Sequence, residues 1–362
     1  MVQDLDRKNY QRVELFEALA HSYYQGDIMP NIKAYAALEA GGKLQPHDYD
    51  PGELSHDHVE IAVEACGLCH SDLSMINNEW RASAYPLIAG HEAVGKITAI
   101  GSHVKNLEIG QRVGVGWNSE SCLHCTPCLS GRHQRCSEGV TTIRGHGGFA
   151  DRIRVQDIWA VPLPDGMDAR SAGPLFCGGI TVFAPMMDFD LKPTDRIGIV
   201  GIGGLGHLAV QFARAWGCEV TAFTTSMDKE DELRELGAHK VINTKDEEAL
   251  KSLKGQYDMV ISTVNVSLPW HRYMTALAPE GRLITVGMVG EPMGISAGQL
   301  ITGQKSVGGS DTGAPHMVAR MLEFCVRHDI KPMVDYFPMS DINEAITHLK
   351  EGKARYRVVL EN

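Results

Sequence analysis

Four cysteines in one short segment constrain the fold of this chain more than any other feature. Cys122, Cys125, Cys128 and Cys136 follow the spacing C-x2-C-x2-C-x7-C. Four thiolates this close together can surround one ion tetrahedrally, and zinc suits such soft ligands best. A set of disulfides is the alternative, although nothing else in the sequence indicates an oxidising compartment. Because a four-cysteine zinc site has no open position for substrate, we predict a structural zinc here and expect the chemistry elsewhere.

Length and charge limit the class of protein. With 362 residues the chain is long enough for two domains, and its formal net charge of −11 argues against nucleic acid as a partner. It has no run of about 18 apolar residues that could cross a membrane, and its first residues are charged where a secretory signal is apolar. The cysteines outside the predicted metal sites, Cys66, Cys218 and Cys325, are expected to be buried small apolar residues. Reduced thiols and metal ligands predict a cytoplasmic protein.

The first half of the chain divides into an extension and a β-rich region. Residues 1–31 form the predicted extension, in which apolar residues at helical spacing indicate an amphipathic helix at Arg12–Tyr24. The sequence then changes to short strands between glycine-rich turns, with period-two alternation at His58–Glu64. Further strands are expected at Gly95–Ile100, Arg112–Val115 and Phe149–Val155. The pattern favours a compact barrel-like β structure, interrupted by the cysteine lobe at residues 119–137.

A different pattern begins at Arg196. The apolar strand Arg196–Val200 leads into the glycine-rich turn Gly201–Gly206, which reads G-x-G-x-x-G, and then into a helix at His207–Trp216. In this context the glycines let a dinucleotide pyrophosphate approach the N-terminus of the helix, where backbone N–H groups favour an anion. A glycine-rich turn without a nucleotide is the alternative. Strands then alternate with helices, which predicts a doubly wound parallel sheet. The expected strands are Glu219–Phe223, Lys240–Asn243, Asp258–Val264 and Gly281–Val286, and the helices between them are Lys229–Leu236, Glu247–Leu253 and Pro269–Leu277. A helix at Pro315–His328, a short β segment and a last strand at Tyr356–Leu360 are expected after this sheet.

Three further residues could form a second, open zinc site, which needs three protein ligands and a vacant position. Cys69 follows a predicted strand, His91 stands between a glycine and a glutamate, and Cys177 lies just before the nucleotide-binding region. Taken singly, each is better explained as a buried core residue. Their occurrence together, in this order around the cysteine lobe, favours ligands of a catalytic zinc ion.

The motifs described so far occur together in one known family. They are GLCHSD at 67–72, GHE at 90–92, the cysteine lobe, CGG at 177–179 and GIGGLG at 201–206. On these motifs the chain resembles the zinc-dependent alcohol dehydrogenases of the medium-chain dehydrogenase/reductase superfamily, over almost its whole length from Ile32. Within that family it is most similar to the cinnamyl-alcohol-dehydrogenase-like branch and its bacterial NADPH-dependent broad-range aldehyde reductases. Segments such as CHSDLSMINNEW and GKARYRVVL carry this closer resemblance.

The resemblance implies an α/β fold with a GroES-like, β-rich catalytic domain and a doubly wound Rossmann domain that binds NADP(H). The catalytic domain would comprise residues 32–180 and 316–362, and the nucleotide-binding domain residues 181–315. Two zinc ions are implied per subunit, one catalytic and one structural, with a small-molecule aldehyde or alcohol as substrate. Relatives are homodimers or homotetramers, so the segment Met288–Ser296 is expected to contribute to a subunit contact.

The resemblance also assigns residue roles. The catalytic zinc would be held by Cys69, His91 and Cys177, and at times by Glu92. Asp72 would orient the ligands, and Ser71 would be the first proton carrier to the substrate oxygen. Many relatives continue this proton relay with a histidine five residues after the first zinc cysteine, where this chain has Ser74. His70 and Arg357 would contact the cofactor pyrophosphate. The other implied cofactor residues are Gly201, Gly203, Gly204, Leu205, Gly206, Thr263 and Gly287.

The loop after the second nucleotide-binding strand predicts which nicotinamide cofactor is bound. An NAD enzyme has an acidic residue there for the ribose 2′-hydroxyl. This chain instead has Thr224, Thr225 and Ser226, followed by Lys229, all of which can donate hydrogen bonds to a 2′-phosphate. We therefore predict NADP. The alternative is that Asp228 serves as the acidic residue from a shifted loop.

Together, the residues and the resemblance predict an enzyme that reversibly reduces aldehydes to primary alcohols with hydride from NADPH. An aromatic alcohol dehydrogenase working toward oxidation is the first alternative, and a non-catalytic relative that binds zinc and nucleotide is the second. The intact three-ligand set argues against the second alternative. Trp80, Tyr85, Trp117 and Phe176 are candidate pocket walls, although the sequence explains them equally well as core residues.

Overall fold

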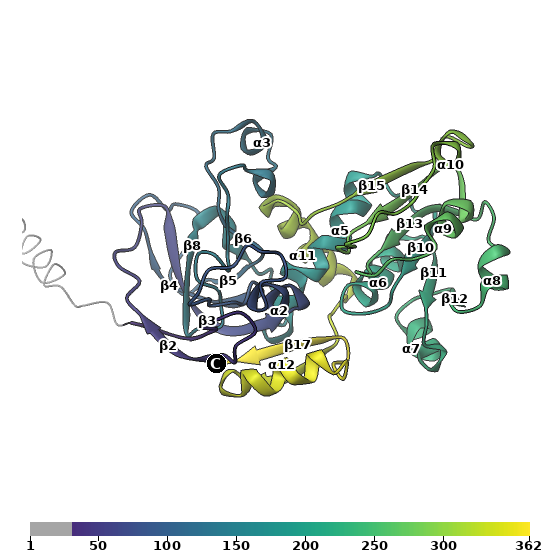
Figure 1. Cartoon of the computed structure of the whole chain (residues 1–362). Coiled ribbons are helices and arrows are strands. Elements are labelled where there is room, and N and C mark those ends of the chain that lie inside the picture. The colour runs from purple at the N-terminus through teal and green to yellow at the C-terminus, as the bar shows by residue number, and fades with distance from the viewer. Residues whose placement is uncertain (1–30) are drawn as a thin grey trace, which may run out of the picture.

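Two sheets organise the protein, one on each side of Figure 1. The computed structural model describes residues 31–362, so the helix predicted at Arg12–Tyr24 lies outside the described residues. The cysteine lobe, which carries α3 (Thr126–Leu129), projects from the half that contains the first sheet (Figure 1). Within residues 31–362, no helix has the length and apolar character needed to cross a membrane.

The first sheet has seven strands and brings C-terminal strands beside strands from the first half of the chain. Its order is β16-β17-β3-β4-β5-β9, with β8 paired to β3. The strands are β3 (His58–Leu68), β4 (Ala93–Ile100), β5 (Arg112–Val115), β8 (Arg152–Gln156), β9 (Val161–Pro162), β16 (Val334–Pro338) and β17 (Arg357–Glu361). The four strands predicted in the β-rich region are β3, β4, β5 and β8. The last strand predicted, β17, pairs antiparallel with β3 in this sheet, with Val358 opposite Leu68.

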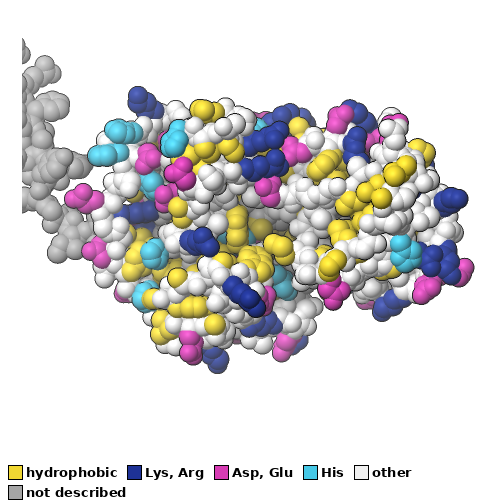
Figure 2. Space-filling view, turned by 45° about the horizontal axis from the view of Figure 1, so that its top comes forward, with side chains coloured by type: hydrophobic (Ala, Val, Ile, Leu, Met, Phe, Trp, Pro, Cys, Tyr) yellow, Lys and Arg dark blue, Asp and Glu magenta, His cyan; other side chains and the backbone are white. Residues whose placement is uncertain are grey.

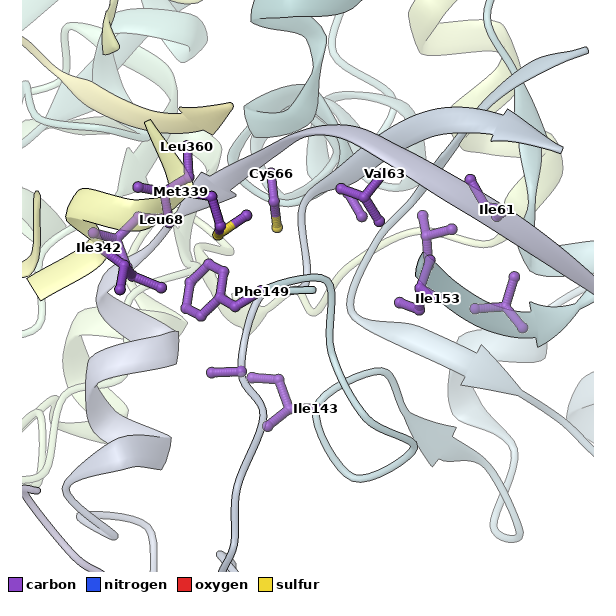
Figure 3. Packing of buried hydrophobic residues seen from close by; sticks show 14 of the residues in the cluster. Ile61, Val63, Cys66, Leu68, Ile143, Phe149, Ile153, Met339, Ile342 and Leu360 are labelled. Atoms are coloured by element: carbon purple, nitrogen blue, oxygen red, sulfur yellow. The ribbon is translucent and has the colours of Figure 1, made fainter. Parts of the chain in front are cut away.

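A continuous apolar core lies against this sheet. Val59, Ile61 and Val63 of β3 are buried in it, as the alternation of that segment predicts. Figure 3 shows side chains from distant parts of the chain gathered in this core, with Phe149 near residues of the C-terminal segment such as Met339. Helix α12 (Ile342–Lys350) supplies the buried face of that segment. The C-terminal residues therefore help to hold the β-rich half together.

The second sheet has six parallel strands in the order β12-β11-β10-β13-β14-β15. The strands are β10 (Arg196–Val200), β11 (Glu219–Thr224), β12 (Lys240–Asn243), β13 (Tyr257–Ser262), β14 (Leu277–Thr285) and β15 (Ser306–Gly309). The predicted doubly wound parallel sheet is thereby confirmed. The strand order reverses between β10 and β13, and doubly wound sheets bind their ligands at the carboxyl ends of the strands at such a point.

Helices cover both faces of the parallel sheet. One face packs against α5 (Gly178–Asp188), α6 (Gly206–Trp216) and α11 (Pro315–His328), and the other against α8 (Glu247–Lys251) and α9 (Trp270–Ala276). The cover on both faces explains why β10 is a continuous apolar run rather than an alternating one. Helix α11 packs on α5 and lies between the two sheets (Figure 1). The domain boundaries near residues 180 and 315 stay a prediction.

The remaining elements are short. They are β1 (Ile32–Ala36), β2 (Gln45–Tyr49), β6 (Asn118–Glu120), β7 (Val140–Thr141), α2 (His70–Ile76), α4 (Ala169–Ala172), α7 (Glu230–Glu235), α10 (Ala297–Ile301), and the 3₁₀ turns η1 (His133–Arg135), η2 (Asp157–Trp159), η3 (Gly173–Phe176), η4 (Met227–Lys229) and η5 (Met339–Asp341).

Candidate active site

Four potential metal ligands from three segments meet between the two sheets. The donor atoms of Cys69, His91, Glu92 and Cys177 all lie within 4.8 Å of one another. Cys69 is the residue that caps α2 at the end of β3, and Cys177 caps α5. The Sγ atoms of these two cysteines are 4.0 Å apart, and Nε2 of His91 lies 3.2 Å from Sγ of Cys177. Two thiolates, an imidazole and a carboxylate form a donor set that suits zinc.

A buried carboxylate, Asp72, fixes the orientation of two of these ligands. Its Oδ1 accepts hydrogen bonds from the Gly90 N–H and from Nδ1 of His91, both at 2.8 Å. Its Oδ2 accepts the Cys69 N–H at 2.9 Å. With Nδ1 donating to Asp72, the Nε2 lone pair of His91 remains free to bind a metal. The structure thus places Asp72 where the orienting role was predicted.

Glu92 is fully buried, and its two carboxylate oxygens have different surroundings. Oε1 accepts a hydrogen bond from the guanidinium of Arg357, whereas Oε2 has no hydrogen-bond partner among residues 31–362. A Cβ at Gly67 would lie 1.9 Å from Oε2, so only glycine leaves room for this carboxylate. A buried carboxylate oxygen without a protein partner beside two thiols and an imidazole is what a cation site requires.

The charge of Arg357 also affects the pKa of the Cys69 thiol. The hydrogen bond with Cys177, together with the charge of Arg357, lowers the pKa of Cys69 well below that of a free thiol, although burial acts in the opposite direction. A guanidinium Nη1 lies 3.8 Å from Sγ of Cys69. Because the thiolate is the metal-binding form, this environment favours metal binding by Cys69.

The four cysteines of the lobe form the second group of potential metal ligands. The Sγ atoms of Cys122, Cys125, Cys128 and Cys136 all lie within 4.8 Å of one another. Sγ of Cys125 and Sγ of Cys136 are 3.9 Å apart, too far for a disulfide, and all nine cysteines of the chain are free thiols. Backbone N–H groups already point at the sulfurs, with Cys122 donating to Cys136 and Cys125 to Cys122, both at 3.3 Å. The arrangement suits a closed four-thiolate zinc site.

Although burial raises the pKa of the Cys136 thiol, backbone hydrogen bonds from Cys122 and Glu138 outweigh this effect and lower that pKa to about 7.

The lobe also contacts the nucleotide-binding half. Arg135, next to Cys136, approaches Asp311 at 3.5 Å and Asp188 at 3.9 Å. A metal bound in the lobe would therefore stabilise a segment that touches both halves of the molecule.

The glycine-rich turn leaves open space where a pyrophosphate is expected. A Cβ at Gly203 would meet no atom within 4 Å, whereas one at Gly206 would lie 2.1 Å from the Gly201 carbonyl oxygen. Gly201 has φ of 86°, a conformation that other residues adopt with strain. Gly201 is thus needed for the turn, Gly206 for the close packing of α6, and Gly203 for access of the pyrophosphate. These are the three uses that a dinucleotide-binding turn makes of its glycines.

Other predicted cofactor residues lie around this turn. The Thr263 hydroxyl donates to the Gly201 carbonyl at 2.6 Å, and a Cβ at Gly287 would lie 2.0 Å from the Val264 carbonyl oxygen. Arg357 packs against Gly204, where a Cβ would lie 3.0 Å from its Nη1. This arginine therefore touches both the glycine-rich turn and the metal ligands, and the turn lies beside the metal ligands.

A buried histidine, His207, is hydrogen-bonded to the glycine-rich turn. The ring of His207 stacks on that of Tyr356, with ring centroids 4.7 Å apart, and Nε2 accepts the Met333 N–H at 3.3 Å. Burial lowers the pKa of His207 to about 3, so the ring is neutral and Nδ1 donates to the Gly203 carbonyl at 3.1 Å. No sequence pattern predicts this contact, because a histidine at the start of an amphipathic helix is ordinarily exposed.

The predicted 2′-phosphate loop follows β11. Thr224 is buried, and its hydroxyl accepts the Ser226 N–H at 3.1 Å, so this side chain shapes the loop rather than facing outward. Thr225 and Lys229 are exposed, and the Lys229 ammonium lies 5.3 Å from the centre of the Tyr356 ring. Asp228 is also exposed, in the 3₁₀ turn that follows. The outward-facing groups that remain for a phosphate are Thr225, Ser226 and Lys229.

The candidate pocket residues separate into two kinds. Trp117 stands edge-on to the His91 ring, with centroids 4.9 Å apart, and Trp80 packs against Trp117 at 5.9 Å. Figure 2 shows a hollow between the two halves with hydrophobic side chains on its walls. Phe176 instead fills the core, because its ring occupies the space that a Cβ at Gly114 would need. Tyr85 is tied to the end of α2, where its hydroxyl donates to the Ile76 carbonyl at 2.8 Å.

The proton-relay residues lie on α2. His70 is exposed, and Ser71 is half-buried at the second position of the helix. Ser74, at the position where many relatives have a histidine, donates a hydrogen bond to Glu79. The sequence analysis did not identify Glu79, because a glutamate after a short helix is ordinarily a solvated surface residue.

A buried thiolate, imidazole and carboxylate donor set beside a dinucleotide-binding turn defines a metal-dependent nicotinamide oxidoreductase. Comparison with known families agrees: the family described as alcohol dehydrogenase GroES-like domain matches residues 55–165, and the zinc-binding dehydrogenase family matches residues 204–327. The protein belongs to the zinc-dependent medium-chain alcohol dehydrogenases.

Relatives of known name extend over nearly the whole chain. An aldehyde reductase, AdhA, from a Synechocystis species is 56% identical over 332 residues, which is 91% of this chain and 99% of the relative. A cinnamyl alcohol dehydrogenase from Sorghum bicolor superposes with a TM-score of 0.87 at 34% identity, covering 91% of this chain and 97% of the other. A CAD protein from Helicobacter pylori, solved in complex with NADP(H), has a TM-score of 0.84 at 29% identity, covering 92% and 98% of the two chains.

Proposed function

We propose that this protein reduces aldehydes to primary alcohols with NADPH, and catalyses the reverse oxidation under suitable conditions. The observation that carries the proposal is that Arg357 touches both the group of four donor atoms and the glycine-rich turn. The similarity to an aldehyde reductase at 56% identity supports the direction and the substrate class. We further propose that the protein acts in the cytoplasm.

The residues around the ligands prepare the site for hydride transfer. When bound, zinc supplies a Lewis acid that polarises the carbonyl oxygen of the aldehyde. Cys69, His91 and Cys177 would hold the ion, with Glu92 available as an additional ligand. Asp72 keeps the Nε2 lone pair of His91 directed into the site. Ser71 would give a proton to the substrate oxygen as hydride reaches the carbonyl carbon.

The walls of the approach to the ligands indicate an apolar substrate. Trp117 beside the His91 ring, and Trp80 packed on Trp117, present aromatic surface and few hydrogen-bonding groups. Such walls suit an aliphatic or aromatic aldehyde better than a sugar. The similarity to cinnamyl alcohol dehydrogenases keeps aromatic aldehydes among the candidates.

The initial rate of hexanal reduction with NADPH and with NADH tests the proposal. We expect rapid oxidation of NADPH by protein purified without chelator, and much slower oxidation of NADH. The absence of turnover with either cofactor, in protein shown to contain zinc, would contradict the proposal and favour a non-catalytic relative. Rapid turnover with NADH alone would keep the enzyme class and contradict the choice of cofactor.

Thr225→Asp tests the 2′-phosphate loop separately. Because an aspartate at this exposed position would repel the phosphate and could accept the ribose 2′-hydroxyl, we expect kcat/KM for NADPH to fall about a hundredfold. The value for NADH should stay the same or rise. Thr275→Asp, at an exposed threonine of α9, is the matched control and should leave the preference unchanged. Unchanged NADPH kinetics in Thr225→Asp would show that this loop does not bind the phosphate.

We also propose that the protein is a homodimer or homotetramer that pairs through the edge of the parallel sheet. Strand β15 is the edge strand on that side. Two large apolar side chains near it, Met288 and Ile301, are 70% and 77% exposed. Burial of these side chains against a second copy would remove an apolar surface from water.

A further inference from the structure

An arginine of the C-terminal segment, Arg355, reaches from the half that contains the first sheet to the nucleotide-binding half. Its backbone N–H donates to Oδ2 of Asp335 on β16 at 3.1 Å, which ties the residue to the first sheet. Its side chain ends on α7, where Nη2 donates to Oε2 of Glu232 at 3.0 Å. The proposed reaction uses the nearby Arg357 but leaves Arg355 without a role.

The ion pair of Arg355 and Glu232 lies beside the loop expected to bind the 2′-phosphate. Lys229 caps α7 and Glu232 is the third residue of that helix, and side chains at these two positions are neighbours. The Lys229 ammonium also lies 5.3 Å from the centre of the Tyr356 ring, and Tyr356 directly follows Arg355 in the chain. Two separate contacts, one through Glu232 and one through Tyr356, therefore bring Arg355 to the side of the loop that carries Lys229.

We propose that Arg355 binds the 2′-phosphate of NADP(H) together with Lys229, so that both halves of the molecule determine the choice of cofactor. This inference rests on the proposed function, because it concerns the phosphate group by which NADP(H) differs from NAD(H). It adds a cation from a distant part of the chain to the groups that Thr225, Ser226 and Lys229 supply from the loop after β11.

The guanidinium of Arg355 keeps donors free for a phosphate. Among residues 31–362, the only hydrogen-bond partner of this guanidinium is Glu232, which accepts from Nη2. An arginine has five N–H donors in a planar fork, and one edge of the fork matches two oxygens of a phosphate. Glu232 can therefore hold the guanidinium through Nη2 while the N–H groups of Nε and Nη1 bind the cofactor.

The local sequence explains why a cation from another segment is needed. Residues 228–232 read DKEDE, so a single lysine stands among four acidic residues. A phosphate monoester carries a charge of about −1.5 to −2 at pH 7, and nearby carboxylates repel it. Arg355 is a cation that the fold brings to α7 from outside this acidic segment, so it offsets part of the repulsion.

A structural role alone is the alternative for Arg355. The side chains of Arg355 and Glu232 are 63% and 19% exposed, and ion pairs with an exposed partner contribute little to stability. An arginine that only held α7 in place would affect the binding of every adenine nucleotide alike. A ligand of the phosphate affects only the nucleotides that carry a 2′-phosphate, which makes the two roles separable.

Binding of 2′,5′-ADP and of 5′-AMP, measured by titration calorimetry on protein purified without chelator, tests the proposal. The two nucleotides differ only in the 2′-phosphate. We expect Arg355→Gln to weaken binding of 2′,5′-ADP about tenfold and to leave that of 5′-AMP unchanged, since a hydrogen bond to a charged group commonly contributes this factor. Arg355→Lys keeps the charge and should lose less. Arg234→Gln, which breaks the ion pair with Glu230 on the same helix, is the matched control and should bind both nucleotides like the original protein.

Glu232→Gln separates phosphate binding from the ion pair. This variant removes the same ion pair but keeps the guanidinium, so its affinity for 2′,5′-ADP should stay the same or rise, because a negative charge near the phosphate is lost. Equal losses of 2′,5′-ADP affinity in Arg355→Gln and Glu232→Gln would overturn the proposal. Unchanged 2′,5′-ADP affinity in Arg355→Gln, or an equal loss for 5′-AMP, would overturn it as well.

The original protein distinguishes a failure of this proposal from a failure of the proposed function. If it binds 2′,5′-ADP no more tightly than 5′-AMP, the choice of NADP fails, and the role of Arg355 fails with it. If it prefers 2′,5′-ADP and Arg355→Gln keeps that preference in full, only the role of Arg355 fails.

Discussion

Cys69→Ser should lower kcat for aldehyde reduction by about a thousandfold or more while leaving the fold intact. Cys69 contributes one of the two thiolates in the candidate catalytic site, with its Sγ 4.0 Å from that of Cys177. A bound metal that polarises a carbonyl supplies several kcal/mol of transition-state stabilisation, and each 1.36 kcal/mol corresponds to about tenfold in rate. Turnover with hexanal and NADPH, zinc content and the thermal unfolding midpoint are the measurements.

A matched control lies in the parallel-sheet half. Cys218 is a buried thiol outside both groups of potential ligands, and its Sγ donates to the Lys192 carbonyl at 3.2 Å. A serine hydroxyl can make the same hydrogen bond, so Cys218→Ser should keep kcat and zinc content. Equal kcat in Cys69→Ser and Cys218→Ser would show that Cys69 does not hold a catalytic metal.

Cys125→Ser separates the two metal sites. Cys125 belongs to the lobe, where the four sulfurs form a group separate from that of Cys69, His91, Glu92 and Cys177. We expect this variant to bind one zinc ion fewer, to unfold several degrees earlier and to be cleaved by proteases between residues 119 and 137, because structural zinc contributes folding free energy directly. Activity measured before the lobe unfolds should be retained. Similar behaviour of Cys69→Ser and Cys125→Ser would contradict the division into catalytic and structural sites.

Much of the fold follows from local patterns in the sequence. The continuous apolar run Arg196–Val200 is a central strand because helices cover both faces of its sheet, and its predicted bounds are those of β10. Pro315 starts α11, and the positive φ of Asp329 ends it, so this helix also has the predicted bounds. The fold class and the four-cysteine lobe could be predicted because spacing along the chain determines them, whereas Cys69, His91 and Cys177 were joined by their co-occurrence and by the family resemblance.

The rest depends on contacts between distant segments, which no local pattern encodes. The long-range pairing of β17 with β3 brings Arg357 beside Cys69 and Glu92, so an arginine predicted only for the pyrophosphate also faces the metal ligands. Helix α12 was not predicted, although its buried face completes the core of the first sheet. Thr224 was predicted to face the cofactor, but its hydroxyl binds within its own loop.

Arg357→Met should destabilise the protein strongly, because it would leave a buried charge without its partner. The side chain of Arg357 is 5% exposed and that of Glu92 is fully buried, and the two form an ion pair. Removing one partner of a buried pair typically costs about 3–5 kcal/mol, chiefly because the other charge stays in a poorly solvated place. We expect the thermal unfolding midpoint to fall by several degrees or more, with zinc content measured in parallel.

A double variant and an exposed ion pair test whether the loss of stability comes from the burial of the Glu92 charge. Arg357→Met/Glu92→Gln removes both charges, so it should regain much of the stability that Arg357→Met loses. Arg196 and Asp258 form a geometrically good pair at 2.9 Å, but their side chains are 41% and 33% exposed. Arg196→Met should therefore cost about 1 kcal/mol or less. Two results would contradict this prediction: an equal fall of the midpoint in Arg196→Met and Arg357→Met, or a double variant no more stable than Arg357→Met. Either result would show that Arg357 does not stabilise the buried charge of Glu92. Arg357 would then act only on the cofactor. Its contact with both the metal ligands and the glycine-rich turn would add nothing to the free energy of unfolding.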